Sequence, residues 1–183
     1  MASVLEPKGL HFFLMAVGFW NFLGAGVFGF LINTPIVSYY EIGTILTINH
    51  GHAAFIGVFG MLGVGLMAYV LREVTSDALW PRLEKFLKVG FWGLNIGLAM
   101  MVVLSLFPAG VLQLHDVLQN GYWHARSLEY TATTLARALE WMRTPGDLVF
   151  IFVGVLPIAL ALLLSYRDMW RSQAAAMQLK PTS

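Results

Sequence analysis

Cysteine and charge are the two features that this sequence lacks. None of its 183 residues is cysteine, which excludes disulfide bonds, thiolate metal sites, c-type haem attachment and a cysteine nucleophile. Charged residues make up only 11% of the chain, whereas a soluble globular domain carries about 25%. Eleven basic and ten acidic side chains leave a formal charge of +1. The composition therefore excludes an ordinary cytosolic domain, a disordered chain and a protein that binds nucleic acid.

Long apolar runs take up most of the chain. Hydrophobic residues make up 58% of it, and the mean hydropathy is +0.71. A transmembrane helix needs about 20 mostly apolar residues, because the hydrocarbon layer of a membrane is about 30 Å thick. Four stretches meet this requirement, at about 12–32, 45–71, 87–107 and 148–166. Lipid offers no partner to an open backbone, so we predict an all-α membrane protein with four transmembrane helices in one membrane domain, 1–183.

The basic residues indicate how these helices cross the membrane. Three of them lie between the third and fourth stretches, at Arg126, Arg137 and Arg143. Eight lie on the other side, at Lys8, Arg72, Arg82, Lys85, Lys88, Arg167, Arg171 and Lys180. Since basic residues favour the cytoplasmic side, we expect both termini in the cytoplasm of a bacterial cell, with lipid around the helices. Residues 109–146 would then form an outer cap, with a short amphipathic helix around 128–142.

Two histidines stand where an apolar helix should begin, in the triplet His50-Gly51-His52. Such residues are costly in a membrane unless they are paired, hydrated or bound to something. Residues two apart on a helix point about 200° apart, so the two rings cannot hold one ion between them. Each could bind a separate planar cofactor, and haem iron accepts an axial histidine. The alternative is a helix cap or an interfacial pair that is hydrogen-bonded to carbonyls.

Four segments resemble the C-terminal part of the large subunit of a known enzyme family. They are Phe-Trp-Asn-Phe-Leu-Gly-Ala-Gly-Val-Phe-Gly-Phe-Leu-Ile-Asn at 19–33, His-Gly-His-Ala-Ala-Phe-Ile-Gly-Val-Phe-Gly-Met-Leu-Gly at 50–63, Phe-Trp-Gly-Leu-Asn-Ile-Gly-Leu at 91–98 and Trp-Met-Arg-Thr-Pro-Gly-Asp at 141–147. This pattern is similar to the quinol-dependent nitric oxide reductases of the haem–copper oxidase superfamily. The resemblance implies that the four helices correspond to the last four of a twelve-helix bundle.

The resemblance also implies roles for particular residues. His50 would be the axial ligand of a high-spin haem b, and His52 one of two axial ligands of a low-spin haem b. The family reduces two molecules of nitric oxide to nitrous oxide and water, with quinol as the electron donor in this form. Asp147 would accept a hydrogen bond from quinol, and Trp141 would form a neighbouring wall. The alternatives are an acid at a helix N-terminus for Asp147 and an interfacial belt residue for Trp141.

The sequence also departs from the family. In the family, three histidines and a glutamate on earlier helices hold the non-haem iron. The second axial ligand of the low-spin haem also lies on an earlier helix. This chain has neither the iron ligands nor that second haem ligand. We therefore expect a fragment, a split-gene subunit or a truncated reading frame, which needs N-terminal helices or a partner subunit and does not turn over alone. The alternative is a non-enzymatic haem- or gas-binding four-helix membrane protein.

The remaining polar residues carry weaker expectations. Arg126 and Arg143 are candidates to pair with haem propionates, because guanidinium matches carboxylate geometry. For Glu41 we predict an exposed loop acid, with control of proton access from outside as the alternative. We expect His115 and His124 to be solvated or capping residues. Side-chain amides are expected to bridge helices at Asn21, Asn33, Asn49 and Asn95.

Overall fold

The computed structural model describes residues 8–178, and among these residues it contains helices and no strand. Four helices are long and apolar enough to cross a membrane, which confirms the predicted fold class. Each of them contains a π-helical segment. The first consists of α1 (Lys8–Trp20), η1 (Asn21–Phe28) and α2 (Gly29–Asn33), and the second of α4 (Ile45–Gly51), η2 (His52–Gly60) and α5 (Met61–Val74). The third consists of α6 (Trp80–Met100), η3 (Met101–Leu106) and α7 (Phe107–Asn120), and the fourth of α10 (Thr144–Leu148), η5 (Val149–Val155) and α11 (Leu156–Gln178).

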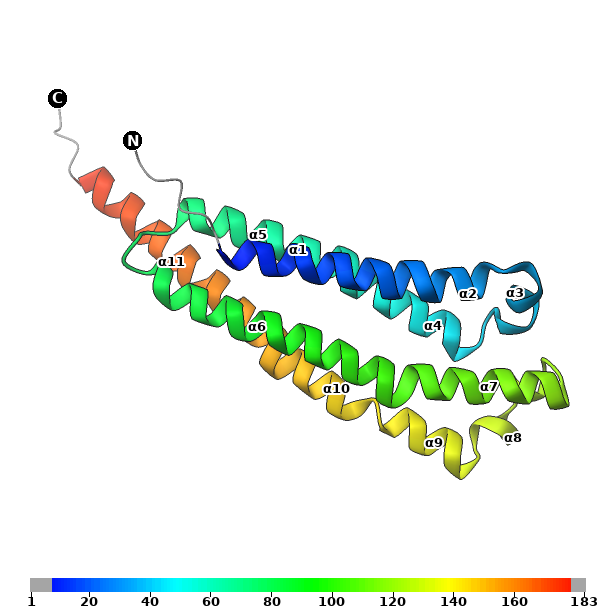
Figure 1. The fold of residues 1–183 in the computed structure, drawn as a ribbon. Coiled ribbons are helices and arrows are strands. Elements are labelled where there is room, and N and C mark those ends of the chain that lie inside the picture. The colour runs from blue at the N-terminus through cyan, green and yellow to red at the C-terminus, as the bar shows by residue number, and fades with distance from the viewer. Residues whose placement is uncertain (1–7, 179–183) are drawn as a thin grey trace.

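Two helical hairpins lie side by side along the length of the molecule (Figure 1). The first and second long helices form one hairpin, and the third and fourth form the other. The start of α1 and the end of α11 lie at the same end of the bundle. The opposite end carries the short helices α3 (Pro35–Glu41), η4 (His124–Arg126), α8 (Leu128–Thr131) and α9 (Thr134–Trp141), and is called the α3 end below.

Small residues let the two helices of each hairpin approach closely. A Cβ atom built on Gly24 would lie 2.6 Å from the carbonyl carbon of Ala53, so the first and second helices meet backbone to backbone there. In the other hairpin, a Cβ on Gly97 would lie 2.6 Å from the backbone nitrogen of Phe150. Close approach of this kind is how helices associate in lipid, where burial of apolar surface gives no driving force between them.

Asn95 is at the centre of one of the polar contacts that join the two hairpins. The indole Nε1–H of Trp20 donates to Oδ1 of Asn95 over 2.9 Å. Nδ2 of Asn95 donates to the Phe91 carbonyl and lies 3.7 Å from the sulfur of Met61. Asn95 thus links the first, second and third helices, as predicted. Asn33 bonds within its own helix to the Gly29 carbonyl, and the buried Asn49 side chain has no partner among the described residues, so the bridging prediction is wrong for these two.

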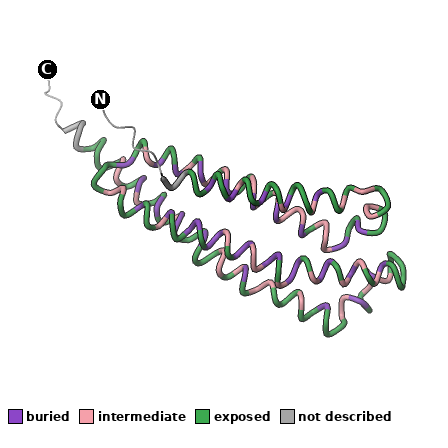
Figure 2. Tube along the Cα trace, in the orientation of Figure 1, coloured by how far each residue is buried: buried purple, intermediate pink, exposed green. Residues whose placement is uncertain are grey.

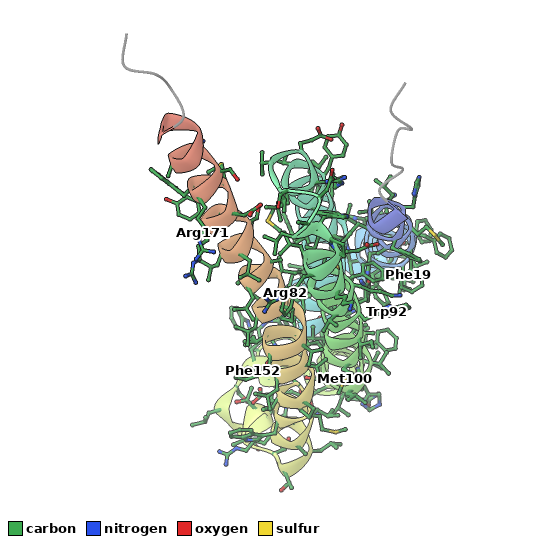
Figure 3. All side chains as sticks on the ribbon, turned by 90° about the vertical axis from the view of Figure 1, so that its left-hand side faces the viewer. Phe19, Arg82, Trp92, Met100, Phe152 and Arg171 are labelled. Atoms are coloured by element: carbon green, nitrogen blue, oxygen red, sulfur yellow. The ribbon has the colours of Figure 1, made fainter. Side chains whose placement is uncertain are left out.

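The outward faces of the bundle are apolar. Buried residues face the interior between the helices, while exposed residues cover the outside (Figure 2). Large side chains such as Phe19, Trp92 and Phe152 project from the bundle (Figure 3), and each is more than half exposed. Such a surface suits contact with lipid or with further apolar helices.

The third helix is longer than the sequence suggested. It was expected to end near Phe107, because proline follows, yet it continues unbroken to Asn120. A proline inside an α-helix removes one hydrogen bond and clashes with the carbonyl four residues earlier. The π-helical segment η3 ends at Leu106, two residues before Pro108, and changes the hydrogen-bond register there. At 41 residues, the helix is about 60 Å long, roughly twice the thickness of the hydrocarbon layer.

The predicted outer segment 109–146 therefore begins as part of this helix rather than as a separate cap. The amphipathic helix expected around 128–142 is present as two short helices, α8 and α9. Thr133 separates them because it is the N-cap of α9, where its hydroxyl accepts from the backbone N–H of Ala136.

The glycine contacts lead to a stability prediction. Gly97→Val would drive a side chain into the backbone of Phe150, and overpacking of this kind costs about 1–3 kcal/mol. The unfolding midpoint of the purified chain, followed by circular dichroism in detergent, should fall. Gly63→Val is the matched control, because no atom lies within 4 Å of a Cβ at Gly63. Equal destabilisation by both variants would contradict the close contact.

Candidate functional site

The histidine pair lies where the second long helix changes from α-helical to π-helical geometry. His50 is in the last turn of α4, and His52 begins η2. This segment packs against η1, the π-helical segment of the first helix. π-Helical segments are rare and often occur at functional sites. Both side chains are half-buried.

The two rings have different partners. Nδ1 of His50 lies 2.8 Å from the carbonyl oxygen of Gly24 on the first helix. Nδ1 of His52 lies 3.0 Å from the carbonyl oxygen of Ile48 on its own helix. A carbonyl only accepts hydrogen bonds, so Nδ1 must carry the proton in both rings. In the neutral imidazole, Nε2 then keeps its lone pair, which is the state required of a metal ligand.

Glycines of the first helix form the wall beside His50. The ring of His50 packs closely against Gly29. A Cβ atom built on Gly29 would lie 3.1 Å from Cε1 of His50. Gly24, whose carbonyl holds Nδ1, is itself pressed against Ala53. The backbone of the first helix therefore fixes both the position and the tautomer of this ring.

His52 belongs to an apolar face that points out of the bundle. The helical spacing of three or four residues places His52 on one face with Ile48, Phe55 and Phe59. These three apolar side chains are 48%, 71% and 65% exposed, respectively. The rings of Phe55 and Phe59 are 5.9 Å apart. A large flat apolar group with a metal at its centre would find one ligand and aromatic contacts on this face.

The metal-ligating side chains of the described residues suit a metal ion that takes a single ligand from this chain. Among residues 11–174, no group of three or more histidine, cysteine, aspartate or glutamate side chains could hold a metal ion. A structural zinc site needs such a group. A haem iron is already held by its macrocycle and needs only an axial ligand, so His50 and His52 fit that group.

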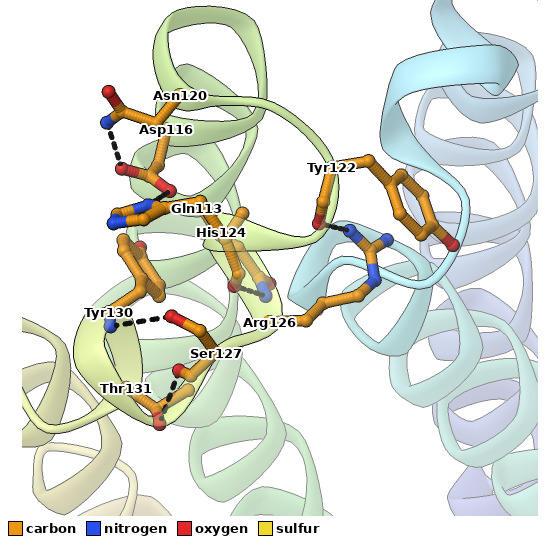
Figure 4. A network of polar contacts seen from close by, with 10 residues as sticks. Gln113, Asp116, Asn120, Tyr122, His124, Arg126, Ser127, Tyr130 and Thr131 are labelled. Atoms are coloured by element: carbon orange, nitrogen blue, oxygen red, sulfur yellow. Dashed lines mark hydrogen bonds and ion pairs between the residues drawn. The ribbon is translucent and has the colours of Figure 1, made fainter.

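A second group of polar residues ties the α3 end together (Figure 4). Gln113 of α7 accepts from the backbone N–H of Ile45 at 2.8 Å, and its amide donates to the carbonyl of Ala125. The guanidinium of Arg126 donates to the carbonyls of Ile42 and Tyr122, and lies 3.3 Å from the centre of the Tyr122 ring. Gln113 and Arg126 thereby connect α7 and η4 to the turn that precedes α4.

Comparison with known proteins decides the family. The family described as "Cytochrome C and Quinol oxidase polypeptide I" matches residues 3–149, which is well over half of the chain. The chain belongs to this family. It is also 35% identical, over 141 residues, to a nitric oxide reductase subunit from Stutzerimonas stutzeri. That match covers 73% of this chain and 28% of the relative, so the chain spans less than a third of the length of that protein.

Membership of the cytochrome c and quinol oxidase polypeptide I family makes the chain an integral membrane protein of a group that generally binds haem. The resemblance found in the sequence is thereby confirmed. The π-helical segments and the glycine contacts described above are how this member of the family holds its histidine pair.

The residues expected to bind quinol or haem propionates lie in different elements and have different hydrogen-bond partners. Trp141 ends α9 and is 75% exposed, and Asp147 lies in α10. Oδ1 of Asp147 accepts from Nε of Arg143 at 3.2 Å, so these two charges neutralise each other. Arg126 is held by the two carbonyls described above. Arg143 uses only Nε in this pair, and Arg126 donates one bond from each of Nη1 and Nη2, so both guanidinium groups keep further N–H donors.

Glu41 contradicts its sequence-based prediction. It is 1% exposed rather than an exposed loop acid, because α3 folds back against α7. Burial raises the pKa of its carboxyl above the usual range, while the hydroxyl of Thr47 and the positive charge of a protonated His50 oppose this shift. The buried Gln113 was also missed, and the sequence gives no clear signal for it, because α7 carries other polar residues such as His115, Asp116 and Gln119.

His124 leads to a prediction about pH. Its Nδ1 lies 2.7 Å from Oδ2 of Asp116, and this hydrogen bond raises the pKa of His124. A group with a raised folded-state pKa stabilises the fold fully below its ordinary pKa, near 6.5, and loses that contribution as the pH rises through the raised value. In an NMR titration of labelled histidines, the His124 signal should therefore change at a higher pH than an unperturbed histidine.

Asp116→Asn should return the His124 titration toward the ordinary value, because it removes the charged acceptor. Asn120→Ala removes only the second partner of the same carboxylate and provides the control. A His124 titration that does not respond to Asp116→Asn would show that the hydrogen bond is absent in solution.

Proposed function

We propose that this chain is the haem-bearing portion of a membrane nitric oxide reductase, in which His50 and His52 are the axial ligands of two different haem b groups. The observation that carries the proposal is the hydrogen bonding of the two rings. Each ring places Nδ1 within hydrogen-bond distance of a backbone carbonyl, and in the neutral imidazole this arrangement leaves the lone pair on Nε2. Family membership and the name of the relative support the choice of reaction.

Backbone carbonyls of this chain would orient the two histidine rings in such a site. The carbonyl of Gly24 holds the ring of His50 from behind, which fixes its direction and increases the basicity of Nε2. The carbonyl of Ile48 does the same for His52. Gly51 lies between the two histidines, and a Cβ atom built on it would have no other atom within 4 Å. Two large haem rings on the two flanks of the helix would therefore meet no side chain at this position. When bound, both haems would supply redox-active iron, and the haem at His50 would also supply a coordination position for a diatomic gas.

The complete reaction would require more than this chain. Two molecules of nitric oxide would give nitrous oxide and water, with two electrons from quinol and two protons. The proposal assigns the non-haem iron and the second ligand of the His52 haem to additional helices or a partner subunit. Residues 11–174 contain no ligand group for such an iron, and the chain spans 28% of the length of its relative. We therefore expect no turnover by this chain alone.

The proposal retains Asp147 and Trp141 at the quinol site. The side chain of Asp147 is 38% exposed, and Arg143 bonds only to its Oδ1 among the described residues. A quinol hydroxyl could donate to the other oxygen. Both termini are proposed to face the cytoplasm, because the end of α5, the start of α6 and the end of α11 lie at one end of the bundle and carry Arg72, Arg82 and Arg171.

Visible spectroscopy tests the assignment of the ligands. The chain, expressed with adequate haem and purified in detergent, should give a b-type spectrum in the dithionite-reduced minus oxidised difference. His50→Ala and His52→Ala should each remove a different spectral species, since the two rings have different surroundings. His11→Ala, a change at the exposed entrance of the first helix, should remove neither.

Two results would contradict the proposal. Loss of the same species in both variants would mean that the two histidines serve one haem, as in a bis-histidine haem shared between copies of a non-enzymatic protein. A wild-type chain without any b-type spectrum would mean that it does not ligate haem.

A further inference from the structure

Glu41 is enclosed at the end of α3, and half of its carboxyl group has no partner. Its Oε1 lies 3.2 Å from the hydroxyl of Thr47, which donates to it. Its Oε2 is fully buried and has no hydrogen-bond partner among the described residues. The backbone carbonyl of Glu41 accepts from the hydroxyl of Thr44 at 2.7 Å, so the residue is firmly held in place.

A buried carboxylate without a counter-charge is far costlier than a neutral carboxylic acid. Arg126, which binds the next residue through the Ile42 carbonyl, makes no ion pair with Glu41, and a His50 ring that keeps Nε2 free for a metal carries no charge. The neutral form of Glu41 carries an O–H group that needs an acceptor. Buried water commonly satisfies such a group, provided that other polar atoms are available to hold it.

Along the chain, Glu41 follows residues that line a pocket and precedes a second buried polar side chain without a partner. Tyr39 and Tyr40, which directly precede it in α3, border a surface pocket of about 430 Å³. The other residues that line this pocket are Val117, Gly121, Tyr122 and Trp123. Asn49 of α4 is 1% exposed and has no partner for either atom of its amide among the described residues. Asn49 immediately precedes His50, so in chain order the partnerless atoms come between the pocket residues and the candidate ligand.

We propose that Glu41 is a proton-relay residue, which passes protons from the pocket at the α3 end to buried water beside Asn49 and His50. In each passage, the carboxyl O–H gives its proton to water on the Asn49 side. The resulting carboxylate takes a proton from water on the pocket side, which restores the acid without any redox change. The inference rests on the proposed function for the uncharged state of His50 and for the reaction that consumes the protons.

Infrared spectroscopy of the full chain in detergent tests the state of this acid. At neutral pH, exposed aspartate and glutamate side chains are ionised, whereas Glu41 should give the C=O band of a neutral carboxylic acid. We expect Glu41→Gln to remove this band. Glu129→Gln, a change at an exposed acid on α8, should leave it in place. Circular dichroism melting of each variant shows whether the fold is retained, and Thr47→Val should keep the band but shift its frequency.

Access of water is tested by transfer to D₂O. The Glu41 band should shift when its proton exchanges, because water from the pocket reaches it. In the haem-loaded chain, reduction should also change the frequency of the band, and Asn49→Leu should abolish that change while retaining the band itself.

Three results would overturn the relay. They are a spectrum unchanged by Glu41→Gln, a band that does not shift in D₂O, and a band insensitive to reduction of the haem at His50. The first two measurements need no haem. A chain that fails to bind haem would therefore contradict the proposed function while the infrared result still decides whether Glu41 is a neutral acid in contact with water.

Discussion

The close approach of the first two long helices at Gly24 and Ala53 determines where His50 can lie. Because these backbones touch, the carbonyl of Gly24 comes within 2.8 Å of the His50 ring. The two π-helical segments η1 and η2 meet at this level. A larger side chain at Gly24 or Gly29 would separate the helices or push the ring aside. The packing of one hairpin therefore sets the tautomer and direction of a candidate ligand that lies on only one of its helices.

The two hairpins differ in how completely they are covered. Half of the apolar window of the third helix is buried, compared with 22% for the first helix and 28% for the second and the fourth. The third helix is thus the centre of the bundle, and Asn95 connects it to both helices of the other hairpin. The open face beside His52 is apolar as well. A chain that spans 28% of the length of its relative has room on these faces for further helices of a larger assembly.

The sequence was informative wherever one physical signal dominated. Hydropathy located the four long helices, since lipid imposes a minimum apolar length. The spacing of His50 and His52 predicted rings with different surroundings. The sequence was misleading where the outcome depended on tertiary contacts. Pro108 does not end the third helix, because the π-helical segment before it changes the hydrogen-bond register. Glu41 is buried because α3 folds against α7, a contact that no local pattern records.

The rigidity of the α3 end connects the two candidate functions of this chain. Arg126 and Gln113 fasten the turn at Ile42–Ile45 to the neighbouring hairpin, and Thr44 caps α4 within the same turn. Glu41 immediately precedes this turn, and His50 follows it by less than two turns of helix. Any movement of the turn would displace the acid and the imidazole together. Since proton transfer depends on short, well-aligned hydrogen bonds, holding both groups through one fastened turn keeps their separation constant. The polar network at the α3 end therefore helps to fix the relative positions of the two candidate groups.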